Sequence, residues 1–178
     1  MIAIETTHLF DLKIEVPVAQ IQEIGSTPVG LRLIVKVTGG EFEGPKLKGS
    51  VVEGDDWLLL RPDGVMQLDC RMTLLTDDGH AICMTYQGRR HGPAEVMGRI
   101  GRGEMVDASE YYHRVSPYFE TASEKYAWLN GLVSVAAGHK QSWGGIYSVH
   151  QVSRSELLQG LDVPELGHRA FSSSKQLV

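Results

Sequence analysis

Residues 65–73 read VMQLDCRMT, and apolar and polar side chains alternate strictly along this stretch. Successive side chains of a β-strand point to opposite faces of the sheet, so the even-numbered residues 66–72 would share one buried face. The odd-numbered residues 67–73 would share the other, polar face. That face is either solvated or lines the inside of a barrel that holds water, and the choice decides whether this strand contributes to an active site.

Short alternating runs extend on both sides of this strand, separated by turn signals. The turns at 62–64 and 77–79 read PDG and DDG, which are typical of hairpin loops. Further strands are expected over residues 30–37, 47–52, 57–61, 80–87, 111–116, 126–137 and 144–152, with 92–105 either a short strand or a helical turn. Because closure removes exposed sheet edges, about eight to ten such strands predict an all-β fold, an antiparallel β-barrel in preference to a sandwich.

Length and composition set the class of protein. The 178 residues fit a single domain, 1–178, whose polar tail from 153 is expected to be peripheral, with Leu157-Leu158 packing as one helical turn. With 42% apolar and 22% charged residues, and no run near the ~18 apolar residues of a membrane span, the chain is expected not to enter a membrane. No secretory signal is visible at the start, which favours the cytoplasm. A net charge of −5 argues against a nucleic-acid partner.

Several kinds of chemistry lack their sequence signatures. The two cysteines, Cys70 and Cys83, form neither a disulfide framework nor a metal-ligand spacing and are expected to be buried thiols. The histidines at 80, 91 and 150 are scattered, so no metal site is expected. The chain has no dinucleotide-binding glycine pattern, no phosphate-binding loop and no nucleophile elbow. We therefore expect no nucleotide cofactor, and no cofactor at all.

A set of short blocks resembles a known family. The blocks are VTGGEFEGP (37–45), DW (56–57), RPDG (61–64), LDCR (68–71), YYHR (111–114), FET (119–121) and YAWLN (126–130). Together they are similar, in order, to the signature blocks of the DUF3237 family, also labelled UPF0311. The similarity runs over residues 30–152, which is most of the chain.

The resemblance implies a small antiparallel barrel of calycin-like or lipocalin-like shape. Most members of the family have no assigned activity. The resemblance also points to isomerase or cyclase chemistry on aromatic natural products, including flavonoid-type ring closure.

Asp69 and Arg71 are the first candidate catalytic pair, since they lie two residues apart on one strand face. They form either an ion pair on a solvated face or part of a lumen. In a lumen, the planar fork of Arg71 would hold an oxyanion or carboxylate, and Asp69 would orient it or move a proton. Arg32 lies on the polar phase of its own strand and is expected to face the same side.

Aromatic and basic side chains form a second candidate set. Tyr112 and Arg114 share one strand face and are predicted to be catalytic, whereas His113 between them would point outward. Small-molecule pockets are mostly apolar and aromatic with a few placed polar groups. The expected ligand-binding residues are Arg32, Trp57, Tyr86, Tyr126, Trp128 and Asn130. The alternative for each aromatic residue alone is a place in the core, with its polar tip satisfied.

Glu43 and Glu120 complete the catalytic candidates. Each follows a phenylalanine near an expected strand end. In an apolar barrel mouth a carboxyl group has a raised pKa and can act as a general acid or base. The alternative is that both glutamates cap loops.

Three functions remain open on these grounds. The first is a cofactor-free enzyme that acts on a small aromatic or apolar oxygenated metabolite by proton transfer, in an isomerisation, cyclisation or lyase step. The second is a barrel that binds and carries a small molecule without changing it. The third is a homodimer with a filled barrel, in which Met66 and Met72, with Ile146 or Val149, lie at the interface.

Overall fold

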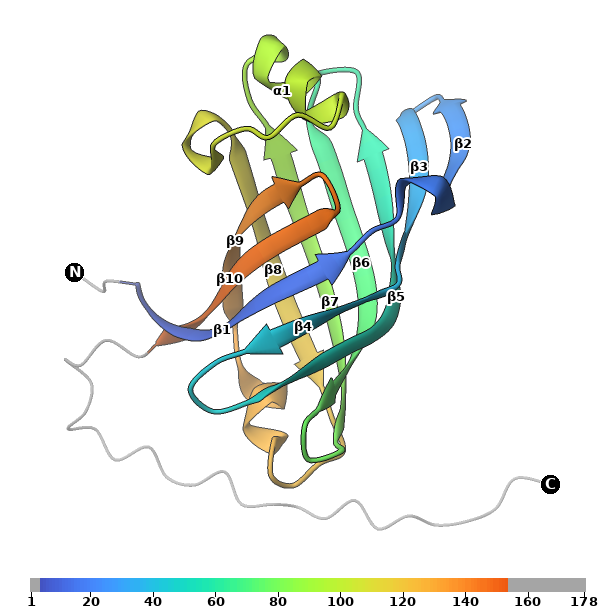
Figure 1. The fold of residues 1–178 in the computed structure, drawn as a ribbon. Helices are drawn as coiled ribbons and strands as arrows, with labels where there is room; N and C mark the ends of the chain where they lie inside the picture. Colours follow the sequence, from blue (N-terminus) through green and yellow to red (C-terminus); the bar gives the residue numbers. More distant parts are fainter. Residues whose placement is uncertain (1–3, 154–178) are drawn as a thin grey trace.

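Ten antiparallel strands form one sheet in the computed structural model, which describes residues 4–153 (Figure 1). The expected helical turn at 157–158 lies outside this range. The strands are β1 (Glu5–Glu15), β2 (Ile21–Thr27), β3 (Gly30–Val37), β4 (Gly39–Glu43), β5 (Lys48–Leu60), β6 (Met66–Thr76), β7 (Ala81–His91), β8 (Tyr112–Glu120), β9 (Ser134–Gln141) and β10 (Gly144–Ser153). One α-helix, α1 (Ala94–Gly101), and three 3₁₀ turns, η1 (Val18–Gln20), η2 (Ala108–Glu110) and η3 (Ala127–Gly131), connect them.

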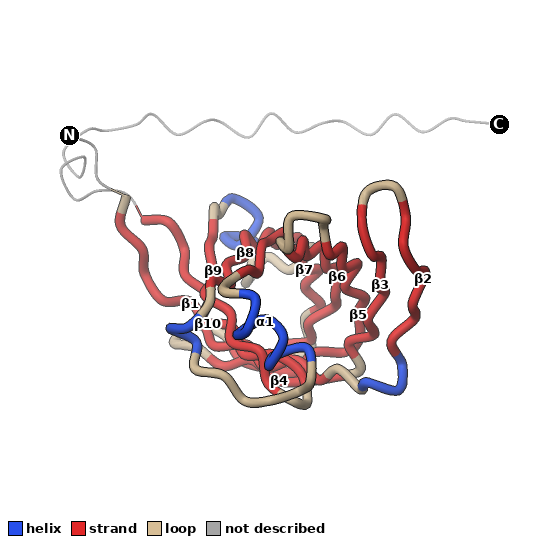
Figure 2. The backbone as a smooth tube through the Cα atoms, turned by 90° about the horizontal axis from the view of Figure 1, so that it is seen from above, coloured by secondary structure: helices blue, strands red, loops and turns tan. Residues whose placement is uncertain are grey.

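The sheet closes on itself through the long strand β5. Along one edge β5 pairs first with β4 and then with β3, and along its other edge it pairs with β6. Eight strands, in the order β5-β4-β1-β10-β9-β8-β7-β6, therefore form a closed ring, and β2 and β3 extend from β5 outside it (Figure 2). The predicted antiparallel barrel is confirmed.

Strand β6 shows how the sequence pattern produces the barrel wall. Its burial alternates residue by residue from Met66 to Thr76, and as far as Leu74 the apolar series lies inside and the polar series outside. Gly79 adopts a φ of 88° in the turn to β7, a conformation that glycine adopts without strain. The turn sets the register in which Met72 lies opposite Met84. The alternating stretch is thus a barrel strand whose polar face is solvated.

The two ends of the barrel interior differ in chemistry. Toward the end away from α1 the interior holds a cluster of phenylalanine rings, in which the ring of Phe10 lies 5.5 Å from that of Phe42 and 5.8 Å from that of Phe119, measured between centroids. The end beneath α1 carries the smaller cluster of Ile100, Val106 and Tyr111, and buried polar residues lie below it. Figure 2 shows α1 over this end of the ring.

The segment after β8 differs from the sequence prediction. The strand expected over 126–137 begins only at Ser134, because residues 127–131 form η3. Asn130 holds this turn against the end of β8, where its Oδ1 accepts from the Thr121 amide at 2.8 Å and its Nδ2 donates to the Thr121 carbonyl at 3.0 Å. For residues 92–105 the sequence left a short strand or a helical turn open, and the structure has the helix α1 there. Of the two thiols expected to be buried, Cys70 is buried but Cys83 is exposed, because it points outward from β7.

Strands β1, β2 and β4 were not expected from the sequence, and the two strands expected over 47–52 and 57–61 form the single strand β5. β1 pairs with β10 and β4, so it completes the ring between parts of the chain that are far apart in sequence. Within residues 4–153, no helix is long and apolar enough to cross a membrane.

Candidate functional site

Asp69 and Arg71 lie on the outer face of β6. Arg71 Nη1 is 3.2 Å from Asp69 Oδ1, and the two side chains keep 63% and 39% of their exposed area. The solvated ion pair is therefore the alternative that matches the geometry. Such a surface pair contributes roughly 0–1 kcal/mol to stability. The catalytic role of the two residues stays a prediction.

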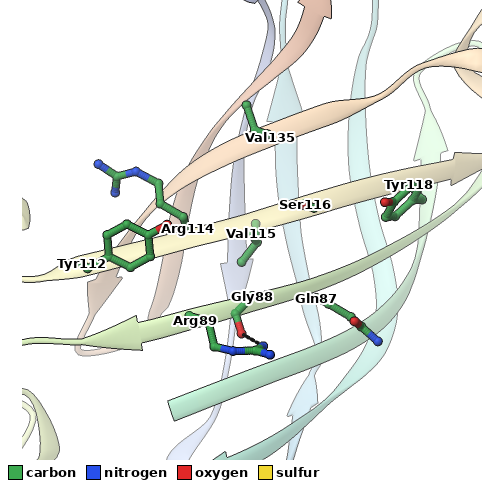
Figure 3. Close-up of a pocket in the computed structure, with 9 residues that line it drawn as sticks. All are labelled: Gln87, Gly88, Arg89, Tyr112, Arg114, Val115, Ser116, Tyr118 and Val135. Atoms are coloured by element: carbon green, nitrogen blue, oxygen red, sulfur yellow. Dashed lines mark hydrogen bonds between the residues drawn. The ribbon is translucent and has the colours of Figure 1, made fainter. Parts of the chain in front are cut away.

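Tyr112 and Arg114 lie on the outside of β8, beside an open groove across β7, β8 and β9 (Figure 3). The groove has a volume of about 540 Å³. The Arg114 guanidinium carbon is 5.3 Å from the centroid of the Tyr112 ring, and Nη1 donates to the His113 carbonyl at 2.8 Å. The two residues do share a face, as the alternation predicted, but it is the outer one.

Glu43 and Glu120 are exposed residues at the ends of β4 and β8. Arg32 donates to the backbone carbonyl of Trp57 at 3.1 Å, and Trp57 is 46% exposed. Like Asp69 and Arg71, these four side chains lie outside the barrel interior. Their assigned roles therefore depend on a site on the outer surface.

The aromatic block near residue 126 closes the end of the barrel away from α1. Tyr126 is buried in the core, and its hydroxyl donates to Asp78 at 3.0 Å. Trp128 packs against the core and has the Lys46 ammonium 5.2 Å from its ring centroid. With Asn130 holding η3, these residues do not converge with Tyr112 and Arg114. Tyr86 is the one predicted site residue that joins the interior polar cluster described below.

A hydrogen-bonded chain of three side chains crosses the middle of the barrel. Asp56 on β5 lies in register with Cys70, which lies in register with Tyr86, so their side chains share the inner face. The Tyr86 hydroxyl donates to Asp56 Oδ2 at 3.1 Å and lies 3.2 Å from the Tyr147 hydroxyl. The Asp69 amide donates to Asp56 Oδ1 at 3.1 Å. If Tyr86 donates to Asp56, then Tyr147 is the donor to Tyr86, and the three groups form one ordered relay.

Burial controls the protonation of this chain. Removal of the Asp56 carboxyl from water raises its pKa to about 6, against the opposing hydrogen bonds from the Asp69 amide and Tyr86. Burial also raises the pKa of Tyr86 and of Tyr147 above the usual value for a phenol, so both remain protonated donors. Burial likewise raises the pKa of the Cys70 thiol, which stays neutral. Asp56 is thus the member of the chain that changes charge near neutral pH.

His113 adjoins this chain, and its predicted outward position is wrong. It is 1% exposed, and its ring meets that of Tyr147 edge-on at 5.4 Å between centroids. Neither ring nitrogen has a hydrogen-bond partner within the described chain. Burial, followed by the charge of Arg90, lowers its pKa to about 3, so the ring is neutral. The alternation in β8 was predicted correctly, but Val115 and Phe119 on the phase of His113 are the signal that marks that phase as the inner one.

Two cations complete the cluster below α1. Arg90 lies in register with His113 and is 8% exposed, and its Nε has no hydrogen-bond partner among the described residues. Lys140 on β9 donates to the carbonyls of Gln141 and Gly144. Burial, and then the charge of Arg90, lowers the pKa of Lys140 to about 8. The sequence prediction assigned no site role to Arg90 or Lys140, and it named Asp56 only as part of the DW block at 56–57.

No group of three or more metal-ligating side chains is present among the described residues. The cluster instead joins a titratable carboxyl group, two phenols, a neutral imidazole and two cations. Such a set can donate and accept protons and can stabilise negative charge on oxygen.

The fold and this cluster together define a small antiparallel barrel with a cluster of buried titratable side chains in its interior. The chain belongs to the DUF3237 family, described as a protein of unknown function, whose model matches residues 4–152. It is 31% identical over 150 residues to the UPF0311 protein RPA1785 of Rhodopseudomonas palustris, a match covering 84% of this chain and 97% of that one. The crystal structure of RPA1785 superimposes with a TM-score of 0.82, at 30% identity and over 86% and 100% of the two chains.

Two further proteins extend the comparison. A β-barrel-like protein of Acinetobacter baumannii is 35% identical with a TM-score of 0.74, over 85% of this chain and 97% of that one. The hydroalkoxylation enzyme phnH of Penicillium herquei is 24% identical over 129 residues, which are 72% of this chain and 66% of that protein. The structure of an enzyme from the same fungus has a TM-score of 0.63 at 20% identity, which shows a shared fold. The chain is thus a member of a largely uncharacterised family with a distant enzymatic relative.

Proposed function

We propose that this protein is a cofactor-free enzyme that moves protons on a small aromatic or apolar oxygenated metabolite, in an isomerisation, cyclisation or lyase step. The observation that carries the proposal is the Asp56 carboxyl group, which is buried, hydrogen-bonded to Tyr86 and has a pKa raised to about 6. A general acid or base is most effective when its pKa lies near the operating pH. Buried groups with perturbed pKa values are typical of active sites.

The roles of the three linked groups follow from their protonation. Near pH 6, Asp56 is present in both its acid and its carboxylate form, so it can deliver a proton to the substrate or remove one. Tyr86 and Tyr147 keep their protons and can donate hydrogen bonds to an oxyanion that develops during the reaction. The 3.2 Å contact between the two hydroxyls also gives the proton a route between β7 and β10.

The fungal relative supports a reaction of this class. Hydroalkoxylation adds an O–H group across a carbon–carbon double bond. The oxygen forms a bond to one alkene carbon while a proton is delivered to the other, so the reaction consumes no oxidant and no reductant. In this chain, Asp56 in its acid form would supply the proton to carbon, and its carboxylate would recover a proton from the substrate hydroxyl group.

The outer-face residues define the competing location for such a site. Asp69, Arg71, Tyr112 and Arg114, with Glu43 and Glu120, are solvated, and the field that acts on an oxyanion is weaker in water than inside the barrel. The interior cluster has the advantage of low dielectric surroundings and fixed partners. An experiment that compares the two locations directly therefore tests the proposal.

The test begins with a thermal-shift screen of phenolic, flavonoid-like, alkenyl-phenol and small carboxylic compounds. A compound that binds the folded state raises the melting temperature. Each hit is then incubated with the enzyme and analysed by chromatography and mass spectrometry, since an isomerisation or cyclisation leaves the mass unchanged and shifts the retention time. We expect Asp56→Asn to lower the rate about 10²- to 10⁴-fold while the ligand-induced thermal shift remains.

The control is Asp55→Asn, which changes the neighbouring half-exposed carboxylate that pairs with Lys36 on the outer side of the barrel. We expect its rate to match that of the wild type. Arg71→Ala tests the outer face in the same assay. A rate that falls with Arg71→Ala but not with Asp56→Asn would move the site outside, and hits that the wild type binds but never converts would identify a carrier.

A further inference from the structure

Arg90 is a buried cation without a carboxylate partner. It is 8% exposed, and the ion pairs found among residues 4–153 do not include it. A guanidinium group stays charged at every accessible pH. A buried charge is costly unless hydrogen-bonded counter-charges surround it. The Nε of Arg90 has no hydrogen-bond partner among the described residues, so this buried guanidinium has a donor free for an anion.

The charges around Arg90 show the sign of that partner. Lys140 is close enough for the charge of Arg90 to lower its pKa, and at about 8 this amine is still mostly protonated at pH 7. Asp56 is the carboxyl group that Arg90 acts on inside the barrel, and it is partly protonated near pH 6. Arg114 and His139 lie near His113 and add no negative charge. The interior below α1 thus holds two cations against at most one carboxylate.

The arrangement also links the cations to the proposed proton-transfer groups. Arg90 lies in register with His113, whose ring packs edge-on against Tyr147. The Tyr147 hydroxyl lies 3.2 Å from that of Tyr86, which donates to Asp56. A continuous series of contacts therefore leads from the cationic end to the carboxyl group. Both ring nitrogens of His113 lack hydrogen-bond partners among the described residues.

We propose that Arg90 and Lys140 bind an anionic oxygen of the substrate, a carboxylate or a phenolate, at the α1 end of the barrel. This inference rests on the proposed function only in placing the substrate at this site. The fork of Arg90 matches the two oxygens of a carboxylate, and Lys140 adds a point charge. The anion would then lie at the end of the series of contacts that runs through His113, Tyr147 and Tyr86 to Asp56.

The test compares pairs of ligands of similar size and shape, one member anionic and the other neutral. The probes are 4-hydroxycinnamate and its neutral amide for the carboxylate, and 4-nitrophenolate and 4-nitroanisole for the phenolate. Binding is measured by calorimetry and thermal shift, without any turnover. We expect the wild type to bind the anionic member of at least one pair tenfold or more tightly than its neutral counterpart, and Arg90→Gln to reduce that ratio to near one.

Arg89→Gln is the matched control, because Arg89 is the preceding residue of β7 and points to the outer face. It should keep the wild-type ratio. A second variant, Arg90→Met, separates binding from folding: if Arg90 awaits a ligand, removal of its unpaired charge should leave the melting temperature of the free protein unchanged or higher.

Three outcomes would overturn the inference: equal affinity for the charged and neutral probes, no binding of either anion at millimolar concentration, or discrimination that survives in Arg90→Gln. A lower melting temperature of Arg90→Met would also count against it, by assigning the guanidinium a structural role. An anion that binds through Arg90 but is never converted leaves this inference standing and contradicts the proposed enzyme. Conversion of a compound that binds without charge discrimination supports the proposed enzyme and contradicts this inference.

Discussion

Burial shifts the pKa values of Asp56 and His113 in opposite directions inside the same barrel. Burial raises the pKa of Asp56 from 3.8 to about 6, so the folded protein holds a proton that the unfolded chain has released between these values. Stability from this group is present below pH 3.8 and is lost as the pH rises through 6. Burial lowers the pKa of His113 from 6.5 to about 3, so its contribution is present above pH 6.5 and is lost as the pH falls toward 3. The two effects oppose each other between about pH 4 and 6.

The raised pKa of Asp56 predicts how the stability of an Asp56→Asn variant depends on pH. At 1.36 kcal/mol per pKa unit, the ionisation of Asp56 costs the folded state about 3 kcal/mol. The variant cannot ionise, so its free energy of unfolding relative to the wild type should rise by up to about 3 kcal/mol between pH 4 and 7. Urea denaturation at a series of pH values measures this difference. The effects of the other titrating groups are common to both proteins and cancel.

Asp55→Asn serves as the control for this measurement, since its half-exposed side chain points away from the barrel interior. Its stability should run parallel to that of the wild type across the same range. A difference between Asp56→Asn and wild type that does not change with pH would mean that Asp56 is not a buried, protonated carboxyl group near pH 5.

Among individual residues, the sequence predicted alternation better than orientation. Tyr112 and Arg114 were correctly placed together and opposite His113, yet the inner and outer faces were exchanged. Polar residues were sought on polar strand faces, whereas the interior cluster places Asp56 and Arg90 on faces that are otherwise apolar. A single polar residue on an apolar face carries little signal in the sequence, because only the neighbouring strands show what it meets.

At the level of elements, the packing of β8 against β9 depends on the imidazole ring of His113. The His113 side chain lies against Gly138, and a Cβ atom built there would be 2.8 Å from the imidazole. Real Cβ contacts of that length do not occur, so β9 needs a residue without a side chain at this position. The tight approach also fixes the ring of His113 beside Tyr147.

Gly138→Ala is therefore expected to destabilise the protein by about 1–3 kcal/mol, because the new methyl group must displace His113 or separate the strands. Chemical denaturation measures the loss. Gly131→Ala in η3 is the control, since its Cβ would meet no atom within 4 Å, and it should have little effect. His113→Ala removes the clash in the Gly138→Ala background. His113→Ala should therefore lower the free energy of unfolding less in that background than in the wild type. Equal costs in both backgrounds would contradict this packing.

The elements that the sequence predicted well are hairpins with local signals. β6 and β7 combine strict alternation with an Asp-Gly turn, and both the pattern and the turn act over a few residues. The segment 126–131 was misassigned because its aromatic residues also suit a strand. Its turn is stabilised by Asn130 binding Thr121 and by Tyr126 binding Asp78, contacts between segments that only the folded chain brings together.

For the whole molecule, closure divides the sheet into a ring and an appendage. β5 has β6 along one edge and both β4 and β3 along the other, which leaves β2 attached through β3 alone. No residue of β2 is buried, whereas β6 and β7 bury every second side chain. Local stability follows buried apolar contacts, so the β2 hairpin is the weakest described part of the sheet.

Hydrogen exchange should reflect this division. We expect the amides of β2 to exchange at least tenfold faster than those of β7, even though β2 is hydrogen-bonded to β3, and mass spectrometry of peptides from the two strands measures the difference. Equal protection at low protein concentration would contradict the division. Protection of β2 that increases with concentration would instead show that its free edge pairs with a second copy. That interface would differ from the one expected from the sequence, because Met66, Met72 and Val149 are buried inside the barrel.

The sequence by itself determined the all-β class, the antiparallel hairpins and the family, because alternation, turn residues and short signature blocks are local properties. Only the tertiary structure decided which strand faces are inside, that β5 closes the ring, and that Asp56, Tyr86, Tyr147, His113 and Arg90 meet there. The physical reason is that burial and low dielectric arise from the packing of distant segments. The pKa values and unpaired charges on which the proposed function depends exist only once the barrel is closed.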